Sequence, residues 1–182
     1  MATKAHDTFW TLFKDRWKLA SEAEVVQREQ ELDDLRFESG DHWDKQVKAD
    51  REKDGKPCLV IDLLSGPIKQ VTNQQRNARP GIQISPVGDG ADPKKAERWQ
   101  GIIRRVERLS QAGKVYAWAG QSQVKMGRGF WVVRNVEVGE SGEQDIRIEE
   151  VDNQHSIYVD PTTKKLDGSD KKWAIRFEDL LH

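Results

Sequence analysis

The fold class is decided by residues 92–138, DPKKAERWQGIIRRVERLSQAGKVYAWAGQSQVKMGRGFWVVRNVEV. Asp92 followed by Pro93 is a favourable helix start, because the Asp side chain caps free N–H groups and proline fits the first helical turn. Apolar residues then recur at helical spacing and predict a buried side made of Trp99, Ile102, Ile103, Val106 and Leu109. We expect this helix to stop at Gly113 and a second helix, near 114–126, to form an antiparallel pair with it.

The chain changes character after the second helix. Residues 129–138 are rich in β-branched and aromatic side chains, and residues 144–151 alternate between polar and apolar. With the turn-forming segment Gly139–Gly142 between them, they predict a β-hairpin. Shorter strands are predicted at 157–159 and 173–177. Helices followed by antiparallel strands favour an α+β fold with a small antiparallel sheet.

Towards the N-terminus, residues 7–39 predict one long helix, with Asp7 as its N-cap. The aromatic face of its first turns is followed, over residues 21–36, by a mostly charged stretch. Such a stretch is typical of a solvated face or of a contact with another subunit. The sequence therefore divides into an N-terminal helical arm, residues 1–39, and an α+β domain, residues 40–182.

The segment that joins these parts is predicted from local patterns. We expect a loop over residues 40–57 and a short buried strand at 58–61. A helix then begins at Asp62 or Ser65, and its apolar stripe is Leu64, Ile68 and Val71. Residues 82–85 alternate like a further short strand.

Composition limits the class of protein. Of the 182 residues, 34% are charged and 36% are hydrophobic, and the formal net charge is −1, so the chain as a whole lacks the basic balance of a phosphate-binding protein. Cys58 is the single cysteine, which rules out a disulfide within the chain. No apolar run is long enough to cross a bilayer and no signal peptide is visible, so we expect a soluble protein made in the cytoplasm.

Metal chemistry finds little support in the sequence. The histidines do not follow a zinc-ligand spacing; they are His6, His42, His155 and His182. Asp160, Asp167 and Asp170 could together hold calcium, but the EF-hand pattern is absent and lysines lie among them, which favours a turn-rich surface loop. We predict neither a metal nor a cofactor.

Two segments have a possible catalytic interpretation. Asp41 and Asp44 lie on either side of His42, an arrangement compatible with general acid–base chemistry in a hydrolase. A loop that ends a helix and packs Trp43 onto the body is the favoured alternative. Similarly, the glycines around Arg128 suggest a turn from helix to strand rather than a phosphate-binding loop, because the lysine–serine pair of such a loop is missing.

The most basic stretch contains Arg76, Arg79, Lys94, Lys95, Arg98, Arg104, Arg105 and Arg108. Lys94, Arg98 and Arg105 fall on one helical face, so a nucleic-acid-binding module is an alternative function. The acids Glu97 and Glu107 lie among them and favour a salt-bridged outer face instead.

The order of these segments resembles the N-terminal region of portal proteins from short-tailed, podovirus-type phages. The resemblance covers about residues 35–175 and depends on several pieces in sequence. An Asn- and Arg-rich helix leads to Arg79-Pro80, the two helices and the turn Gly127-Arg128-Gly129 follow, and the stretch 146–170 ends in an aspartate pair. Before them, FESGDHWD occupies the place of an aromatic-glycine-Trp segment.

The resemblance implies a ring, usually of twelve subunits, at one vertex of the capsid in the virion. DNA would pass through its channel, and sister subunits, coat protein, terminase and tail adaptor proteins would be its partners. Such proteins are not enzymes. The matched region would belong to the outer wing, with the chain ending before the stem and clip regions, and Trp10, Trp17 and Arg28 are the residues we expect to contact sister subunits or coat.

Overall fold

The computed structural model describes residues 2–78, 81–88, 90–139, 142–165 and 168–178. Its helices are α1 (Ala2–Glu38), α2 (Lys45–Lys53), α3 (Ser65–Asn77), α4 (Pro93–Leu109) and α5 (Ala112–Met126). Its strands are β1 (Trp131–Val138), β2 (Glu143–Glu150), β3 (Ile157–Val159) and β4 (Ala174–Arg176), with a single 3₁₀ turn at Gln154–Ser156 before β3. The predicted α+β class is confirmed.

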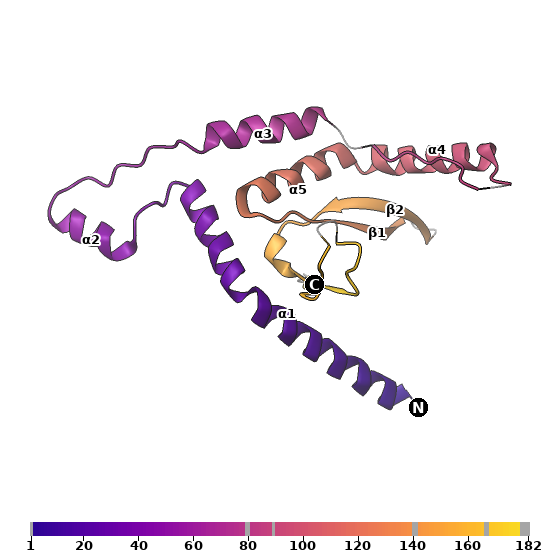
Figure 1. Ribbon diagram of the computed structural model, residues 1–182, viewed down its shortest axis with the longest axis horizontal. Coiled ribbons are helices and arrows are strands. Elements are labelled where there is room, and N and C mark those ends of the chain that lie inside the picture. The colour runs from indigo at the N-terminus through magenta and orange to yellow at the C-terminus, as the bar shows by residue number, and fades with distance from the viewer. Residues whose placement is uncertain (1, 79–80, 89, 140–141, 166–167, 179–182) are drawn as a thin grey trace.

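The strands form two separate two-stranded antiparallel sheets rather than one. In the first, β1 and β2 make the predicted hairpin, from the pair Trp131 and Glu150 to the pair Val138 and Glu143. In the second, β3 pairs with β4, so that Ile157 lies opposite Arg176. The hairpin lies between α5 and the second sheet. Helix α1 runs past the second sheet, away from α4 (Figure 1).

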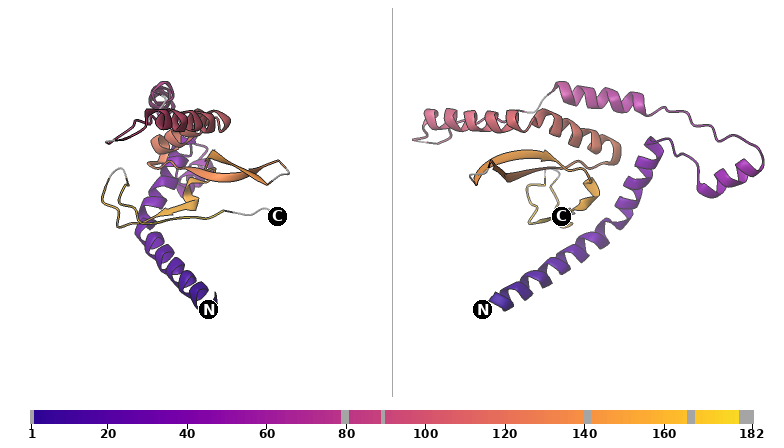
Figure 2. Two further views of the ribbon diagram at one scale, coloured as in Figure 1. Left: turned by 90° about the vertical axis from the view of Figure 1, so that its right-hand side faces the viewer. Right: turned by 180° about the vertical axis from the view of Figure 1, so that it is seen from behind.

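The buried core is small for a chain of this length. It centres on Ala112 and Val115 of α5 and Ile148 of β2, with Val106 and Tyr116 packed against them. The accessible surface is 14476 Å², whereas a compact monomer of 20.9 kDa is expected to expose about 9,000 Å². The chain is thus an open arrangement of elements, with α1 and α4 projecting from the centre (Figures 1 and 2).

The prediction of an antiparallel pair for α4 and α5 is wrong. Only Ser110 and Gln111 separate the helices, and Gln111 is left-handed, with φ 49° and ψ 41°. Such a short connection bends the path without reversing it, so α5 continues away from the end of α4 (Figure 1). Gly113, expected to stop the first helix, lies inside α5. The helix that runs antiparallel beside α5 is α3.

The predicted buried side of α4 is only partly buried. Val106 packs against the core, but Trp99, Ile102 and Leu109 are 59%, 48% and 42% exposed. The reason is the position of α4, which extends beyond α5 and the hairpin, so that little of its length has a neighbouring element to cover it (Figure 1).

Two predicted strands are absent as strands. Residues 58–61 are extended but pair with no strand in the described part of the chain, and Leu59 and Ile61 are 73% and 71% exposed. Around Ile84 the neighbour is a side chain instead: the Ile84 N–H donates to Oε1 of Gln100 at 2.7 Å, and Nε2 of Gln100 donates to the Ile82 carbonyl at 2.8 Å.

Helix boundaries also differ from the prediction at two places. The long N-terminal helix already starts at Ala2, so Asp7 lies within it and is not its N-cap. Within the expected loop 40–57, Asp44 caps α2 by accepting from the N–H groups of Gln46 and Val47. The expected start of α4 at Asp92 is confirmed, since its carboxylate accepts the Lys94 N–H. The N-cap of α3 is Leu64, and Asp62 accepts the N–H groups of Leu64 and Ser65 just before the helix.

Candidate assembly interface

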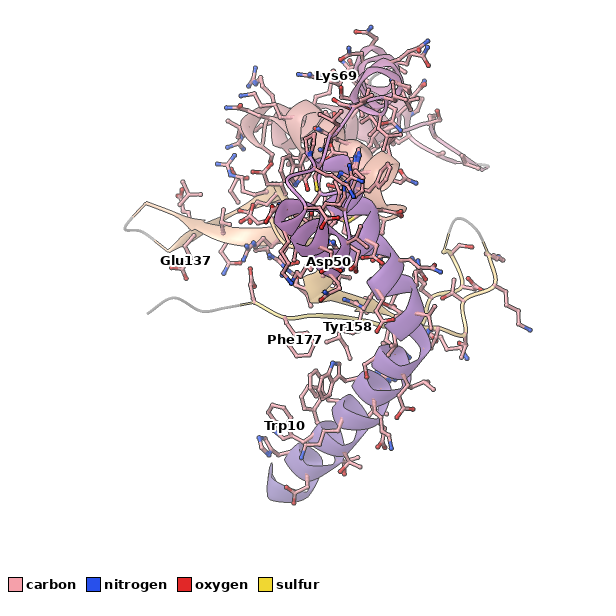
Figure 3. The ribbon with its side chains drawn as sticks, turned by 90° about the vertical axis from the view of Figure 1, so that its left-hand side faces the viewer. Trp10, Asp50, Lys69, Glu137, Tyr158 and Phe177 are labelled. Carbon is pink, nitrogen blue, oxygen red and sulfur yellow. The ribbon has the colours of Figure 1, made fainter. Side chains whose placement is uncertain are left out.

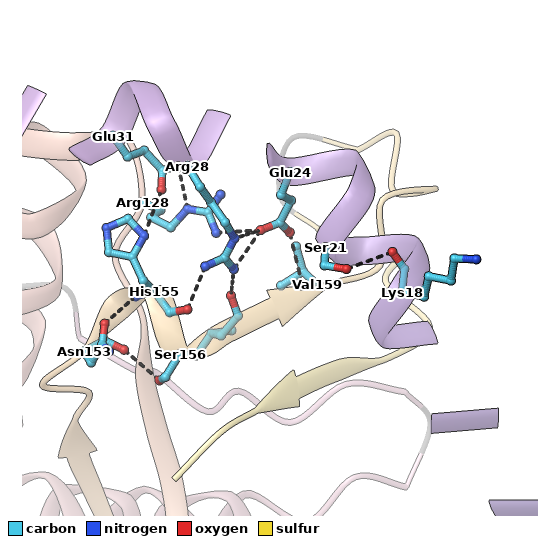
Figure 4. A network of polar contacts seen from close by, with 11 residues as sticks. Lys18, Ser21, Glu24, Arg28, Glu31, Arg128, Asn153, His155, Ser156 and Val159 are labelled. Atoms are coloured by element: carbon cyan, nitrogen blue, oxygen red, sulfur yellow. Dashed lines mark hydrogen bonds and ion pairs between the residues drawn. The ribbon is translucent and has the colours of Figure 1, made fainter. Parts of the chain in front are cut away.

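The charged half of α1 lies against the body of the chain and is not simply a solvated face. Glu24, Arg28 and Glu31 are spaced i, i+4 and i+7, which places them on one side of the helix. Glu24 and Glu31 are 6% and 3% exposed. Arg28 donates to Oε2 of Glu24 at 2.9 Å and to the carbonyls of His155 and Ile157, each at 2.7 Å (Figure 4).

Arg128 completes this network from the turn between α5 and β1. Its Nε donates to Oε1 of Glu31 at 2.7 Å and its Nη1 to Oε2 of Glu24 at 3.0 Å. Two buried carboxylates therefore face two guanidinium groups, which balances the charge and compensates for the loss of hydration. This seam fixes α1 to the second sheet, where the Val159 N–H also approaches Oε1 of Glu24 at 3.5 Å.

The two glycines beside Arg128 make this placement possible. Gly127 has φ +80° and ends α5. A Cβ on Gly129 would lie 1.9 Å from the Ala119 carbonyl oxygen, so the backbone approaches α5 more closely than any side chain permits. The turn from helix to strand is thus the structural role of this Gly-Arg-Gly sequence.

His155 borders the same network. Its Nδ1 lies 3.5 Å from Oε2 of Glu31. Burial lowers the pKa of His155, and the cations Arg28 and Arg128 lower it further, while Glu31 acts in the opposite direction. The neutral imidazole is therefore the form that the folded chain favours at pH 7.

The first half of α1 carries a row of aromatic rings. Trp10 packs edge-on against Phe13, with ring centroids 5.6 Å apart. Trp17 and Phe13 both contact Phe177, at 5.9 and 6.2 Å, and Phe177 contacts Tyr158. Figure 3 shows Trp10 well along α1 from Phe177 and Tyr158, where the helix has left the body. The end of the row nearest the N-terminus is accordingly the most open.

The three expected contact residues lie in different environments. Trp10 and Trp17 are 44% and 40% exposed, and both are accessible to a partner. Arg28 is largely buried, and its guanidinium also lies 3.8 Å from the centroid of the Tyr158 ring. Its contacts above are all within the chain, so its main described role is to attach α1.

The basic residues of α4 lie on its surface. Lys94, Arg98 and Arg105 are all exposed on it. Arg105 lies 4.0 Å from Asp145 at the hairpin. Burial raises the pKa of the Tyr116 hydroxyl, and Glu107, which the sequence placed among these cations, faces Tyr116 and raises it further.

The side chains around His42 make local contacts that stabilise the end of α1 and the loop after it. The imidazole stacks on Phe37, with centroids 4.0 Å apart, and its Nε2 lies 2.8 Å from the Phe37 carbonyl oxygen. Asp41 pairs with Arg36 at 3.1 Å. Trp43 donates to the Leu59 carbonyl at 3.1 Å. The arrangement ends α1 and holds the following loop.

The aspartates of the loop after β3 organise its backbone. Asp160 is 2% exposed and accepts from the N–H and hydroxyl of Thr162, which lower the pKa of its carboxyl. Asp170 accepts from the Lys164 N–H at 2.8 Å. Asp167 lies outside the described residues. Across the residues that are described, no group of three His, Cys, Asp or Glu side chains is placed to hold a metal ion.

A groove of about 950 Å³ lies between the end of α4, β2 and the C-terminal strand. Four of its ionisable groups are paired with one another: Arg134 with Glu149 and Glu178, and Arg176 with Glu178 at 2.8 Å. These ion pairs are typical of a salt-bridged protein surface and do not by themselves indicate a catalytic site.

Comparisons with known proteins identify the family of the chain. Residues 14–181 match the family model described as phage P22-like portal protein. A search of curated proteins gives no significant match. Among the described residues, no helix has the length and apolar character needed to cross a membrane.

Proposed function

Because this chain belongs to the phage P22-like portal protein family, we propose that it is a structural subunit of the ring that joins the head of a virus to its tail at one capsid vertex. The family match covers nearly the whole sequence and supports a structural portal role. In this role the ring serves DNA packaging and ejection, and DNA passes through its channel.

One observation carries the proposal beyond the family match: the chain exposes 14476 Å², which is roughly 5,000 Å² more than a compact monomer of its size would expose. Elements with open apolar sides, such as α4 and the start of α1, account for part of this excess. Exposed apolar surfaces of this kind are typical of sites that other subunits cover in an assembly.

The partners in this proposal are sister subunits, coat protein, terminase and tail adaptor proteins, in a ring that is most simply a dodecamer. Trp10 and Trp17 on the open part of α1 are the residues we assign to contacts with sister subunits or coat. No chemical step is assigned to the chain. The buried ionisable groups Glu24, Glu31, Arg128 and Asp160 make contacts within the chain, which supports a structural role.

A second function, nucleic-acid binding by α4, is favoured by its exposed cations Lys94, Arg98 and Arg105. Binding to phosphates would weaken steeply as salt increases, because each contact releases counterions. Titration of a DNA duplex at two salt concentrations measures this slope. A shallow slope or no binding would remove the second function.

The portal role is tested on particles of the phage that encodes the chain. An epitope tag on this chain should be labelled by gold-conjugated antibody at a single vertex of each capsid. Label spread over the shell, or particles that lack the chain altogether, would reject the portal role.

A further inference from the structure

The outward side of α1 carries an acidic and apolar stripe, defined by Glu22, Val25, Val26, Glu29, Leu32 and Asp33. These residues lie opposite the buried face of Glu24 and Glu31 at helical spacing. Val25, Val26 and Leu32 are 49%, 65% and 53% exposed. Lys18 and Arg36 pair with the acids at its two ends, at 3.9 and 3.3 Å, and Glu29 lies between them.

One exposed side of α4, beside the core-packed Val106, carries a stripe of the opposite charge, defined by Lys95, Arg98, Trp99, Ile102, Arg105 and Leu109. Its apolar members are Trp99, Ile102 and Leu109, which are among the exposed residues described above. Its cations are exposed as well. The acids of α4, Glu97 and Glu107, point away from this stripe at helical spacing.

The two stripes have matching dimensions. The α1 stripe covers 12 residues and the α4 stripe 15 residues, which correspond to lengths of about 17 and 21 Å along the helix axes. Each combines three large apolar side chains with three charges of one sign, so that pairing them would bury apolar surface and bring charges of opposite sign together.

These stripes do not meet within one chain. The buried side of α1 packs on the second sheet, and α4 lies on the opposite side of the hairpin (Figure 1). Turning the molecule shows the same separation (Figure 2). A partner that carries one stripe therefore has to be a different molecule.

We propose that the α1 stripe of one copy docks on the α4 stripe of the next copy, as a head-to-tail contact that repeats around an assembly. The inference rests on the proposed portal role and adds the surfaces by which subunits contact one another. A contact between two different patches leaves one free patch at either end of a row of copies, and such a row closes into a ring when the rotation between successive copies allows it.

The excess exposed area leaves room for a contact with a neighbour on each side. Permanent interfaces bury about 2,000–5,000 Å² in total, or about 1,000–2,500 Å² on each partner. A subunit with two neighbours therefore covers about 2,000–5,000 Å², which is comparable to the excess surface of this chain.

The contact is tested with two variants of the full chain, called the blocked variants, in each of which a charge disrupts one stripe. Val26→Lys places an ammonium group in the apolar part of the α1 stripe, and Ile102→Lys does so in the α4 stripe. Each should weaken self-association of the purified chain at least about tenfold, because a buried unpaired charge costs several kcal/mol. Sedimentation velocity over a range of protein concentrations measures this association.

Mixing the two variants gives the decisive result. Each retains the stripe that the other has lost, so the mixture should form dimers of one copy of each variant and nothing larger. A contact between identical patches would give no such dimer. Wild-type chain that stays monomeric at the highest concentration, or variants that associate as wild type does, would overturn the inference.

Charge reversals supply matched controls. Glu29→Lys and Arg98→Glu should each weaken self-association, and together they should restore part of it. Asp34→Lys and Arg104→Glu are charge reversals of the same sign on the same helices but outside the stripes, and should leave association within about twofold of wild type. Equal effects of stripe and control variants would also reject the inference.

Two other results separate this inference from the functions above. If DNA binding, and not self-association, is lost in Arg98→Glu, the α4 stripe has nucleic acid as its occupant and the head-to-tail contact is rejected. If the tagged chain lies at one vertex but the blocked variants associate normally, the portal role stands and the assignment of these surfaces fails.

Discussion

Arg128 donates its Nε hydrogen to Oε1 of Glu31 at 2.7 Å across 97 positions of sequence. This bond and its counterpart to Glu24 attach the N-terminal helix to the turn between α5 and β1. The charges involved are almost completely buried, so each depends on the others for compensation.

Removal of the Arg128 guanidinium should therefore destabilise the folded chain strongly. In Arg128→Met, Glu24 and Glu31 lose buried contacts to a cation, and we expect the free energy of unfolding to fall by about 3–5 kcal/mol. Urea unfolding followed by circular dichroism measures it. Arg134→Met is the matched control, because its partners Glu149 and Glu178 are on the surface, and a loss of no more than about 1 kcal/mol is expected there. Similar losses in both variants would contradict the role given to Arg128.

Gly129 should not tolerate a methyl group. The added Cβ of Gly129→Ala would overlap the Ala119 carbonyl oxygen, and relieving the overlap should cost at least about 2 kcal/mol. Gly113→Ala is the control, since no atom lies within 4 Å of its added Cβ and alanine in a helix is favoured over glycine by about 1 kcal/mol. Thermal unfolding should shift in opposite directions for the two variants, and a shift in the same direction would count against the close approach.

His155 should make the fold sensitive to mild acid. Burial lowers its pKa below the ordinary value of 6.5, so between these two values the unfolded chain binds more protons than the folded chain. Stability is then fully present above pH 6.5 and decreases as the pH falls through this window. Urea unfolding at pH 7.5 and pH 5 should show a smaller decrease for His155→Gln than for wild type. Identical decreases would show that another group is responsible.

Asp160 should matter through its hydrogen bonds and not through calcium. Thr162 and the Lys172 N–H donate to its carboxylate, and the pKa of the carboxyl is lowered. In Asp160→Asn an amide nitrogen replaces one accepting oxygen, so the midpoint of thermal unfolding should fall. Stability of the wild type should also decrease below pH 3.8, the ordinary pKa, as the carboxyl becomes protonated. A rise in the wild-type midpoint on addition of calcium would contradict this role.

Trp10 should be needed for assembly and not for folding. Its ring is 44% exposed, so Trp10→Ala should change the free energy of unfolding by no more than about 1 kcal/mol. The amount of tagged chain recovered in purified capsids should decrease markedly. Normal incorporation of Trp10→Ala would remove Trp10 from the contact surface.

Local patterns in the sequence predicted much of the fold. The hairpin follows from alternation and a glycine turn, and the start of α4 follows from Asp92–Pro93, because these signals act over a few residues. The apolar face of α4 was predicted as buried since periodicity identifies an apolar side but not what covers it. Gly113 was a misleading stop signal because Gln111 adopts the left-handed conformation instead.

The assembly surface was less predictable. The charged stretch of α1 has a hidden inner face, and no local signal indicates that Arg128 pairs with it from so far along the chain. Phe177, which supports the aromatic row, was likewise predicted only as part of a strand. The i, i+4, i+7 spacing of Glu24, Arg28 and Glu31 was the available indication that these charges share one side.

The left-handed Gln111 sets the direction in which α4 leaves the body. Helix α4 is 17 residues long, so a rotation of 10° at Gln111 displaces its far end by about 4 Å. A small change in the backbone conformation of Gln111 would therefore produce a large change in the angle between successive molecules that are joined through α4. In the head-to-tail contact proposed above, the conformation of Gln111 would then set the curvature of a closed assembly and, with it, the number of members.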